Sequence, residues 1–422
     1  MLTRSHKFHV PQEVEHLCSI LFKAGEDAYI VGGSLRDLLS NRTPSDWDIA
    51  TSATPVKVIK IFKRTVPTGI KHGTVTVLIN NTPMEVTTLR GEGDYTDGRR
   101  PDNVTFICDI EEDLSRRDFT INAMAWDPAT QLLHDPFDGQ KDLKAKVIKA
   151  VGDPTRRFEE DGLRLLRAAR FAATLKFKIE PLTLKAMPGT SSTLEKVSIE
   201  RKRDELIKTL GATSPSLGLN VMAQTSLLCY ISRHLAKLTG KNWEEALCRV
   251  DNTPIELRLR LASLLMGTKE KNREWLTDMR FDRQTIMKTT HLLTILEEVD
   301  FNLKYTDANI RRLLNHMGRN AIDDFFAVKK AAQITCKRPE AELQTFKDRV
   351  NLILASNAPL SIKELAIRGS DIINILNIPP GPQIGYLLNA LLEHVQNIPE
   401  DNSQNRLLNV AQGLIDCKSS SR

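Results

Sequence analysis

The stretch IVGGSLRDLLSNRTPSDWDIATSATP, residues 30–55, decides the fold and the chemistry of this chain. A short apolar run leads into Gly32 and Gly33, and Arg36 follows three residues after the second glycine. Ten residues after Arg36, Asp46 and Asp48 flank a tryptophan. This order predicts a strand, a glycine turn that opens a helix, and a second strand that carries two carboxylates.

Asp46 and Asp48 are two residues apart, so in a strand both side chains lie on one face. Adjacent carboxylates repel, and each raises the pKa of the other unless a cation lies between them. A pair of divalent metal ions removes this repulsion and suits phosphoryl chemistry. Taken alone, the triplet favours a solvated loop with two acidic residues, because such triplets are common by chance. The preceding glycine turn favours the metal site, because glycines let the backbone approach a phosphate and a helix N-terminus offers free N–H groups.

A third carboxylate comes from the stretch MEVTTLR, residues 84–90. Its alternation puts Glu85, Thr87 and Leu89 on one face of a strand and the residues between them on the other. We expect Glu85 to join the two aspartates; the alternative is an ordinary solvent-facing glutamate.

Charged residues also stand beside an apolar run in SRRDFTIN, residues 115–122. One interpretation is a surface ion-pair cluster of little energetic value. The other is a triphosphate site, in which Arg117 binds phosphate oxygens through two N–H groups and Asp118 orients it.

The stretch EDGLRLLRAAR, residues 160–170, repeats a charge every three residues at Asp161, Arg164, Arg167 and Arg170. On a helix these residues share one broad face. A basic amphipathic helix is the plainer interpretation. The sharper one is a protein template for a nucleobase, in which an aspartate accepts from an exocyclic amine and an arginine donates to a ring nitrogen. Cytosine and adenine fit this pair, whereas guanine and uracil leave its buried polar groups unpaired.

Length and composition limit the class of protein. A chain of 422 residues is too long for one core, so we expect two to four units. No apolar run approaches the roughly 20 residues that a membrane span needs, and the N-terminus lacks the apolar segment of a secretory signal. A net charge of +6 permits a polyanionic partner. The cysteines form no CxxC pair, which predicts no zinc site and thiols in a reducing, cytoplasmic compartment: Cys18, Cys108, Cys229, Cys248, Cys336 and Cys417.

The apolar periodicity changes along the chain. Short β-type runs dominate the first 150 residues, and helical periodicity follows from about residue 155. This change predicts an α+β fold, with a sheet-bearing unit followed by helices.

These motifs together resemble the class II nucleotidyltransferases, which include the tRNA CCA-adding enzymes and bacterial poly(A) polymerases. The resemblance implies a nucleotidyltransferase head with a small mixed β-sheet over residues 1–150, followed by three all-α parts. These are a neck that recognises the base over 151–215, a body over 216–345 and a tRNA-binding tail over 346–422. The boundaries within the helical half are the least defined.

The resemblance also implies roles for single residues. Asp46 and Asp48 would bind two Mg²⁺ ions, with Glu85 as a third acidic catalytic residue, so that the RNA 3′-hydroxyl attacks the nucleotide α-phosphate. Asp161 and Arg164 match the base-templating positions. The remaining nucleotide-binding residues match contacts to triphosphate, ribose or base, with the individual roles of Asp118 and Asn122 left open: Gly33, Arg36, Arg117, Asp118, Asn122, Arg167 and Arg170.

The expected activity is therefore addition of C and A from CTP and ATP to the 3′ end of tRNA, recognised at its acceptor arm and T-arm. The stretches GIKHGTVTVLI and MEVTTLRGEGDYTDGRRPD resemble the CCA-adding branch. An intact loop over residues 90–103 favours addition of the terminal A, and full CCA addition and A-only addition both stay open. A poly(A) polymerase and a non-catalytic RNA-binding protein are the alternatives, and the oligomeric state is left open.

Overall fold

The computed structural model describes residues 4–5, 8–70, 73–91, 107, 109–268, 271–299, 305–336 and 341–419. The chain forms two compact units, Met1–Leu238 and Thr239–Arg422. Residues 92–103 of the predicted loop and Cys108 lie outside the described residues. The four-part division into head, neck, body and tail stays a prediction.

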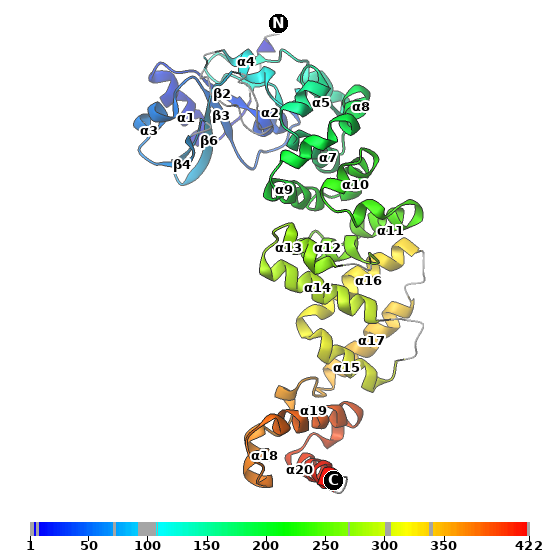
Figure 1. Cartoon of the computed structure of the whole chain (residues 1–422). Coiled ribbons are helices and arrows are strands. Elements are labelled where there is room, and N and C mark those ends of the chain that lie inside the picture. The colour runs from blue at the N-terminus through cyan, green and yellow to red at the C-terminus, as the bar shows by residue number, and fades with distance from the viewer. Residues whose placement is uncertain are drawn as a thin grey trace. The chain divides into compact units, whose positions relative to one another are not determined.

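The first unit is built on a mixed sheet in the order β1-β8-β7-β2-β3-β6-β5-β4 (Figure 1). Only β3 and β6 pair in parallel within it among the described strands. Its strands are β1 (Arg4–Ser5), β2 (Ala28–Val31), β3 (Asp48–Thr51), β4 (Thr65–Gly69), β5 (Thr74–Ile79), β6 (Thr82–Thr88), β7 (Ala125–Trp126) and β8 (Leu132–His134). The helices in this part of the chain are α1 (Gln12–Lys23), α2 (Gly32–Leu39), α3 (Pro55–Ile61), α4 (Ile110–Ser115), the 3₁₀ turn η2 (Thr120–Asn122) and α5 (Gly139–Ala145).

A two-residue turn joins β5 to β6. Asn80 and Asn81 both have positive φ, 50° and 67°, which asparagine tolerates better than most residues and which matches the twist of a hairpin. The hairpin fixes the register of β6, and with it the side of the sheet on which Glu85 lies.

The two faces of the sheet carry different residues because side chains alternate along each strand. On one face Val31, Ala50 and Leu89 pack against Ile110 and Leu114 of α4 in a buried cluster. Asp48 and Glu85 lie two and four residues before Ala50 and Leu89 in their strands, so the carboxylates share this face. The buried cluster therefore anchors the strand segments that present them.

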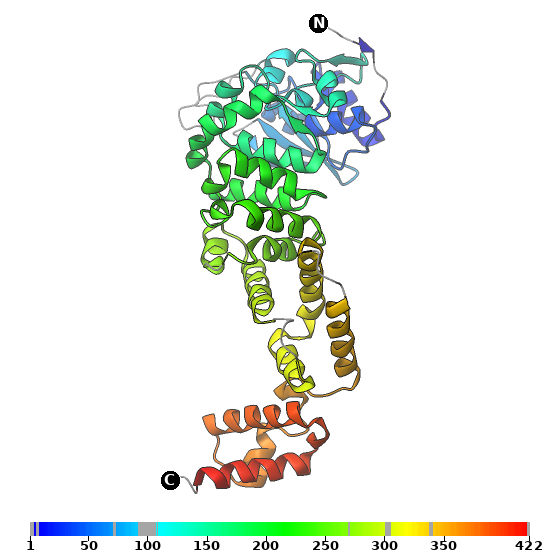
Figure 2. The ribbon, with the colours of Figure 1, turned by 90° about the vertical axis from the view of Figure 1, so that its right-hand side faces the viewer.

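Helices follow the sheet, as the change of periodicity predicts: α6 (Pro154–Glu160), α7 (Leu163–Leu175), α8 (Pro181–Thr190), α9 (Ile199–Leu210) and α10 (Pro215–Gln224). Two short strands, β9 (Val147–Ile148) and β10 (Lys178–Ile179), form a separate parallel pair. Helix α7 packs against both α9 and α10, and Figure 2 shows this part of the chain in green from the side.

One expectation for this region is wrong. Asp161 does not share a helix with Arg164, because α6 ends at Glu160 and Asp161 is extended, with φ −145° and ψ 103°. Helix α7 begins only after Gly162. A Cβ on Gly162 would stand 2.8 Å from the backbone carbonyl carbon and oxygen of Thr193, so a close backbone approach holds the chain in this break.

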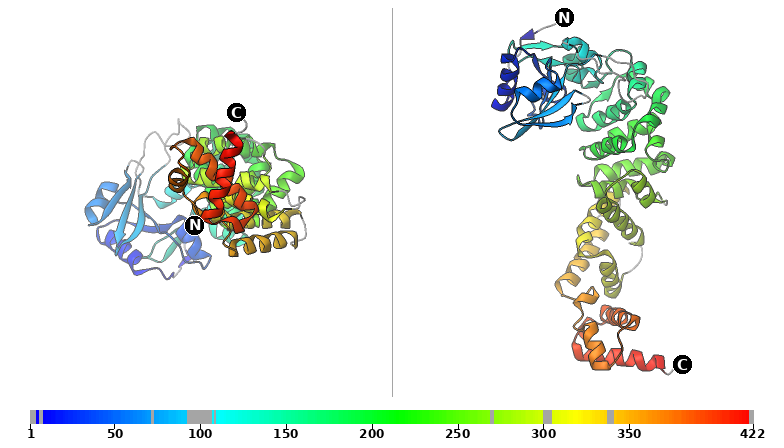
Figure 3. Two further views of the ribbon diagram at one scale, coloured as in Figure 1. Left: turned by 90° about the horizontal axis from the view of Figure 1, so that it is seen from below. Right: turned by 60° about the vertical axis from the view of Figure 1, so that its left-hand side comes forward.

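The second unit is helical in all its described regular elements: α11 (Gly240–Asp251), α12 (Leu257–Leu265), α13 (Asn272–Asp278), α14 (Arg283–Glu298), α15 (Asp307–Met317), α16 (Ile322–Cys336), α17 (Ala341–Ala355), α18 (Gly369–Leu376), α19 (Pro382–Asn397) and α20 (Gln404–Ser419). Its last three helices enclose a core that includes Ile372, Leu391 and Leu407 (Figure 3). The predicted α+β class, with a small mixed sheet followed by helices, is thus confirmed.

Two composition-based expectations concern membranes and thiols. Among the described residues, none of the helices combines the length and the apolar character that a bilayer span requires. Cys18 is buried, and three other described cysteines are exposed free thiols. The side chain of Cys417 is not among those described.

Candidate active site

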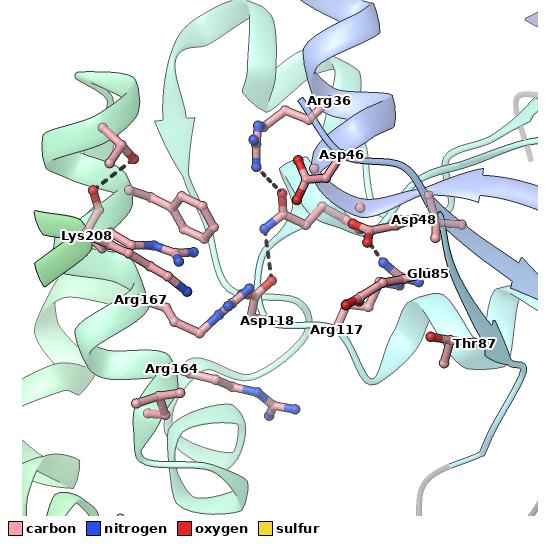
Figure 4. A pocket seen from close by; sticks show the side chains of 18 of the residues that line it. Arg36, Asp46, Asp48, Glu85, Thr87, Arg117, Asp118, Arg164, Arg167 and Lys208 are labelled. Atoms are coloured by element: carbon pink, nitrogen blue, oxygen red, sulfur yellow. Dashed lines mark hydrogen bonds and ion pairs between the residues drawn. The ribbon is translucent and has the colours of Figure 1, made fainter. Parts of the chain in front are cut away.

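A pocket of about 860 Å³ opens in the first unit, and all twelve predicted site residues line it. They come from α2, from β3 and the segment before it, from β6, from the α4–η2 segment, and from α7 and the junction between α6 and α7. Figure 4 shows Asp46, Asp48 and Glu85 on one side of the pocket and Arg164 and Arg167 on the other. Basic residues outnumber acidic ones in the lining, as an anionic ligand requires.

The three carboxylates come together through strand register. Asp48 begins β3 and stands directly opposite Glu85 in the parallel pair with β6. Asp46 precedes the strand by two residues, and the tryptophan between the aspartates is buried. Burial, followed by the charges of Asp46 and Glu85, raises the pKa of Asp48, and the charge of Arg117 only partly offsets them. Burial and the neighbouring carboxylates thus both disfavour the charged form of Asp48, which a bound cation would favour.

Gly32 makes the turn beside these carboxylates possible. Its φ is +67°, which an L side chain rarely adopts. A Cβ at this position would also stand 3.1 Å from Asp48 Oδ2 and 3.3 Å from Arg117 Nη1. The next residue, Gly33, donates its backbone N–H to Asp48. The glycine pair thus lets the start of α2 touch the carboxylate that begins β3.

Within the described residues, no group of three or more His, Cys, Asp or Glu is arranged to hold a metal ion by itself. Mg²⁺, however, commonly takes one or two carboxylates and completes its shell with water and substrate phosphates. The aspartate pair fits that donor set. Burial, followed by repulsion from Asp46 and Glu85, raises the pKa of Asp48, and a cation would relieve the repulsive part.

Three guanidinium groups surround one aromatic ring in the pocket. Those of Arg36, Arg167 and Arg170 lie 5.5, 5.4 and 4.4 Å from the centre of the Phe171 ring. Contact with the ring face stabilises each cation. Burial, followed by the charge of Arg167, lowers the pKa of Arg170. This crowding of cations is what a polyanion such as a triphosphate would relieve.

Asp118 holds one of these arginines. Its carboxylate accepts hydrogen bonds from Arg167 Nε at 2.6 Å, from Asn122 Nδ2 and from the backbone N–H of Phe119. Burial alone would raise the pKa of Asp118, but the charge of Arg167 and these hydrogen bonds outweigh it and lower the pKa to about 2. The expectation that Asp118 orients Arg117 is therefore wrong. Asp113 does so instead, 3.2 Å from Arg117 Nη2.

Asn122 connects two parts of the site. Its Oδ1 accepts from Arg36 Nη1 at 2.8 Å, while its Nδ2 donates to Asp118 Oδ1 at 3.1 Å. An asparagine can do both because its amide carries an acceptor and a donor. It thereby fixes Arg36 relative to the Asp118–Arg167 pair.

The predicted base-reading pair, Asp161 and Arg164, lines the same pocket and is tightly held. Arg164 donates to Glu160 Oε2 at 2.6 Å and to the backbone oxygens of Arg157 and Arg116. A guanidinium has five N–H groups, so these bonds to described residues leave two for a ligand. Asp161 accepts the backbone N–H of Leu163 and pairs with Arg201.

A second helix, α9, also lines the pocket and was not predicted from the sequence. Arg201 and Lys208 of α9 belong to the lining, and Glu205 between them pairs with Arg170 of α7 at 3.3 Å. Their i, i+4, i+7 spacing marks one helix face and was visible in the stretch IERKRDELIKTL. The helix that this face meets was not visible, because the contact between Arg170 and Glu205 joins residues 35 positions apart.

Three family models match the chain in succession. The "Poly A polymerase head domain" matches residues 28–149, and the "Probable RNA and SrmB- binding site of polymerase A" matches residues 176–238. A model of tRNA nucleotidyltransferase domain 2 matches residues 256–411. The first match contains the carboxylate wall of the pocket.

Whole proteins match over nearly their full length. A CCA-adding enzyme of Pediococcus pentosaceus is 39% identical, over 96% of this chain and 99% of that protein. One of Enterococcus faecalis is 36% identical, over 96% of this chain and 97% of that protein. The crystal structure of the Bacillus stearothermophilus CCA-adding enzyme in complex with CTP matches with a TM-score of 0.80 and 30% identity, covering 97% of this chain and 99% of that one. By sequence and by structure alike, the chain belongs to the family of CCA-adding enzymes.

Proposed function

We propose that this protein adds C, C and A to the 3′ end of tRNA from CTP and ATP, without a nucleic-acid template and with release of pyrophosphate. One observation carries the proposal: a single pocket is lined by both the Asp46–Asp48 pair and the Asp161–Arg164 pair, and Figure 4 shows the two aspartates across the pocket from Arg164. The two aspartates suit metal-assisted nucleotidyl transfer, and Asp161 with Arg164 suits selection of the base. The family to which the chain belongs supports the activity.

The carboxylate side would hold two Mg²⁺ ions on Asp46 and Asp48, with Glu85 as the third acidic partner. When bound, such ions neutralise charge on the phosphates and favour the alkoxide of the attacking 3′-hydroxyl. Glu85 adds negative charge beside Asp48, so it strengthens the attraction of the site for cations. Gly33, by donating its backbone N–H, keeps the Asp48 carboxylate in place.

The arginines between the two sides would bind the triphosphate and the ribose. Arg36 and Arg117 flank the start of α2, where a helix N-terminus also favours an anion. Arg167 and Arg170 approach from α7 and are oriented by Asp118 and Glu205. Because carboxylates and Phe171 already hold these guanidinium groups, little side-chain entropy remains to be lost when the nucleotide binds.

Asp161 and Arg164 would select the base. Asp161 accepts from the exocyclic amine of cytosine or adenine, and one of the two remaining N–H groups of Arg164 donates to the ring nitrogen beside it. Uracil and guanine present a carbonyl to Asp161 and an N–H to Arg164, which leaves buried groups unpaired. Such mismatches support discrimination of about 10⁴-fold or more.

The tRNA would be bound through its acceptor arm and T-arm by the helical remainder of the chain. The match of residues 256–411 to a tRNA nucleotidyltransferase domain supports this assignment. The fold is shared with that of a Thermotoga maritima CCA-adding enzyme complexed with tRNA, which is 21% identical with a TM-score of 0.64.

The test uses three tRNA transcripts that end at the discriminator base, at C and at CC. Each is incubated with Mg²⁺ and with ATP, CTP or both, and the products are resolved at single-nucleotide length. We expect three, two and one additions, respectively, when both nucleotides are present. Addition of A to the CC-ended tRNA alone would make the protein an A-adding enzyme, and long A ladders would make it a poly(A) polymerase.

A further inference from the structure

Asp161 is held by an arginine from helix α9. Arg201, in the first turn of α9, lines the pocket and donates from Nη2 to Asp161 Oδ2 at 2.9 Å. On the other side, the backbone N–H of Leu163 donates to Asp161 Oδ1 at 3.0 Å. The side chains of Asp161 and Arg201 are 18% and 28% exposed, so the pair is partly shielded but open to a ligand.

These two donors fix the plane of the carboxylate. The terminal torsion of an aspartate is broad, so an untethered Asp161 would turn over a wide range. Arg201 also donates from Nη1 to Asp161 Oδ1 at 3.5 Å. Donors on both oxygens remove this freedom, while an ionised carboxylate keeps about one of its four lone-pair positions for a ligand. The direction in which Asp161 accepts a further hydrogen bond is thereby set before any nucleotide arrives.

We propose that Arg201 is a positioning residue that determines nucleotide specificity, by holding Asp161 in the orientation that accepts the exocyclic amine of cytosine or adenine. This inference rests on the proposed role of Asp161 in base selection. Without Arg201, the carboxylate can turn away from a uracil or guanine carbonyl, or a water molecule can lie between them. The free-energy penalty for binding the wrong base is then smaller. Cytosine and adenine also bind less tightly, because the carboxylate of Asp161 must lose its rotational freedom when the base binds.

A purely structural role for Arg201 predicts something different. The pair connects the α6–α7 junction to α9, but Arg170 and Glu205 form a second link between α7 and α9 at 3.3 Å. Leu206 and Leu210 of α9 are also buried. These contacts keep α9 in place when Arg201 is replaced, so we expect folding to survive. A structural cross-link alone would alter stability and leave the ratio of right to wrong nucleotide unchanged.

The variants that separate these roles are Arg201→Met, Arg201→Lys, Arg203→Met and Asp161→Ala. Methionine keeps the length of the side chain without its charge. Lysine keeps the charge without the planar fork. Arg203 is the matched control, because it is on the same helix, pairs with Asp204 and is absent from the pocket lining.

For each full-length variant, kcat and KM are measured with CTP against UTP on tRNA ending at the discriminator base, and with ATP against GTP on tRNA ending in CC. We expect Arg201→Met to lower both selection ratios by about tenfold, the effect of losing one charge-assisted hydrogen bond. The KM for CTP and ATP should rise with kcat less affected. Arg201→Lys should restore part of the ratio, and Arg203→Met should match the parent protein.

Two results would overturn the proposal. The first is a selection ratio in Arg201→Met equal to that of the parent protein, while Asp161→Ala loses selection. The second is a lower KM for CTP in Arg201→Met, which would mean that Arg201 competes with the base for Asp161. If Asp161→Ala itself keeps full selection, the base-reading role fails instead. If circular dichroism shows that Arg201→Met does not fold, Arg201→Lys alone tests the proposal. A selection ratio and a KM equal to those of the parent protein in Arg201→Lys would then count against it.

Discussion

The pair formed by Asp118 and Arg167 offers a prediction whose size follows from the structure. The pKa of Asp118 falls from 3.8 to about 2 in the folded protein. One pKa unit corresponds to about 1.4 kcal/mol, so the folded state stabilises the carboxylate by about 2 kcal/mol. Because the Arg167 side chain is 32% exposed, solvent screening lowers the figure, and we expect Asp118→Asn to cost about 1–2 kcal/mol of unfolding free energy at pH 7.

The sign of the pH dependence follows from the direction of the shift. The pKa of Asp118 is lower in the folded state than in the unfolded state, so the stabilisation is fully present above the unfolded value. It is lost as the pH falls through the folded value. The difference between the parent and Asp118→Asn should therefore stay constant down to about pH 5 and shrink below it.

The assay is urea unfolding followed by tryptophan fluorescence. Trp243→Phe and Trp275→Phe are introduced first, so that only Trp47 and Trp126 of the first unit report. A double-mutant cycle with Arg167→Met then isolates the pair. A coupling energy near zero, or a difference between parent and variant that does not change between pH 7 and pH 3, would refute the reasoning.

Three further predictions test the carboxylate side and the base-reading side. Asp48→Asn should lower kcat at least about a thousandfold, because loss of a metal ligand removes several kcal/mol of charge stabilisation from the transition state. The melting temperature should stay the same or rise. Appreciable activity in this variant would show that Asp48 is not a metal ligand. Gly32→Ala should destabilise the first unit by about 1–2 kcal/mol through its positive φ, and it should also lower kcat by crowding Asp48. Gly25 is the control, because its φ is +78° and a Cβ there would have no atom within 4 Å. Gly25→Ala should therefore lower stability without lowering kcat, and equal losses of kcat in the two variants would contradict this explanation. Glu160→Gln should raise the KM for both CTP and ATP by about tenfold, because Arg164 loses a charged acceptor; an unchanged KM would show that the backbone oxygens alone hold Arg164.

Local signals in the sequence predicted much of the fold. Asn80 and Asn81 supplied the two positive φ values that the hairpin needs. Helix α3 begins at Pro55, and Thr54 caps it by accepting the backbone N–H of Lys57; threonine followed by proline is a common start of a helix. Turn and cap chemistry involves only neighbouring residues, so single stretches reveal it.

The same local reasoning failed where distant segments meet. The three-residue spacing from Asp161 to Arg170 suggested one helix, but the approach of Thr193 to Gly162 breaks it. The order Arg-Arg-Asp suggested that Asp118 orients its neighbour, but its partner Arg167 is 49 residues away. The choice of partner for a buried charge is made by tertiary packing, which no single stretch records.

The central claim is that one pocket adds C, C and A, and chooses these nucleotides with protein side chains. It is tested most directly by giving the protein a tRNA that ends at the discriminator base, equal concentrations of all four nucleoside triphosphates and Mg²⁺, and then sequencing the 3′ ends of the products. The account predicts that nearly all extended molecules end in CCA and grow no further. Products that carry U or G within the added nucleotides, or that continue into A tails, would contradict it.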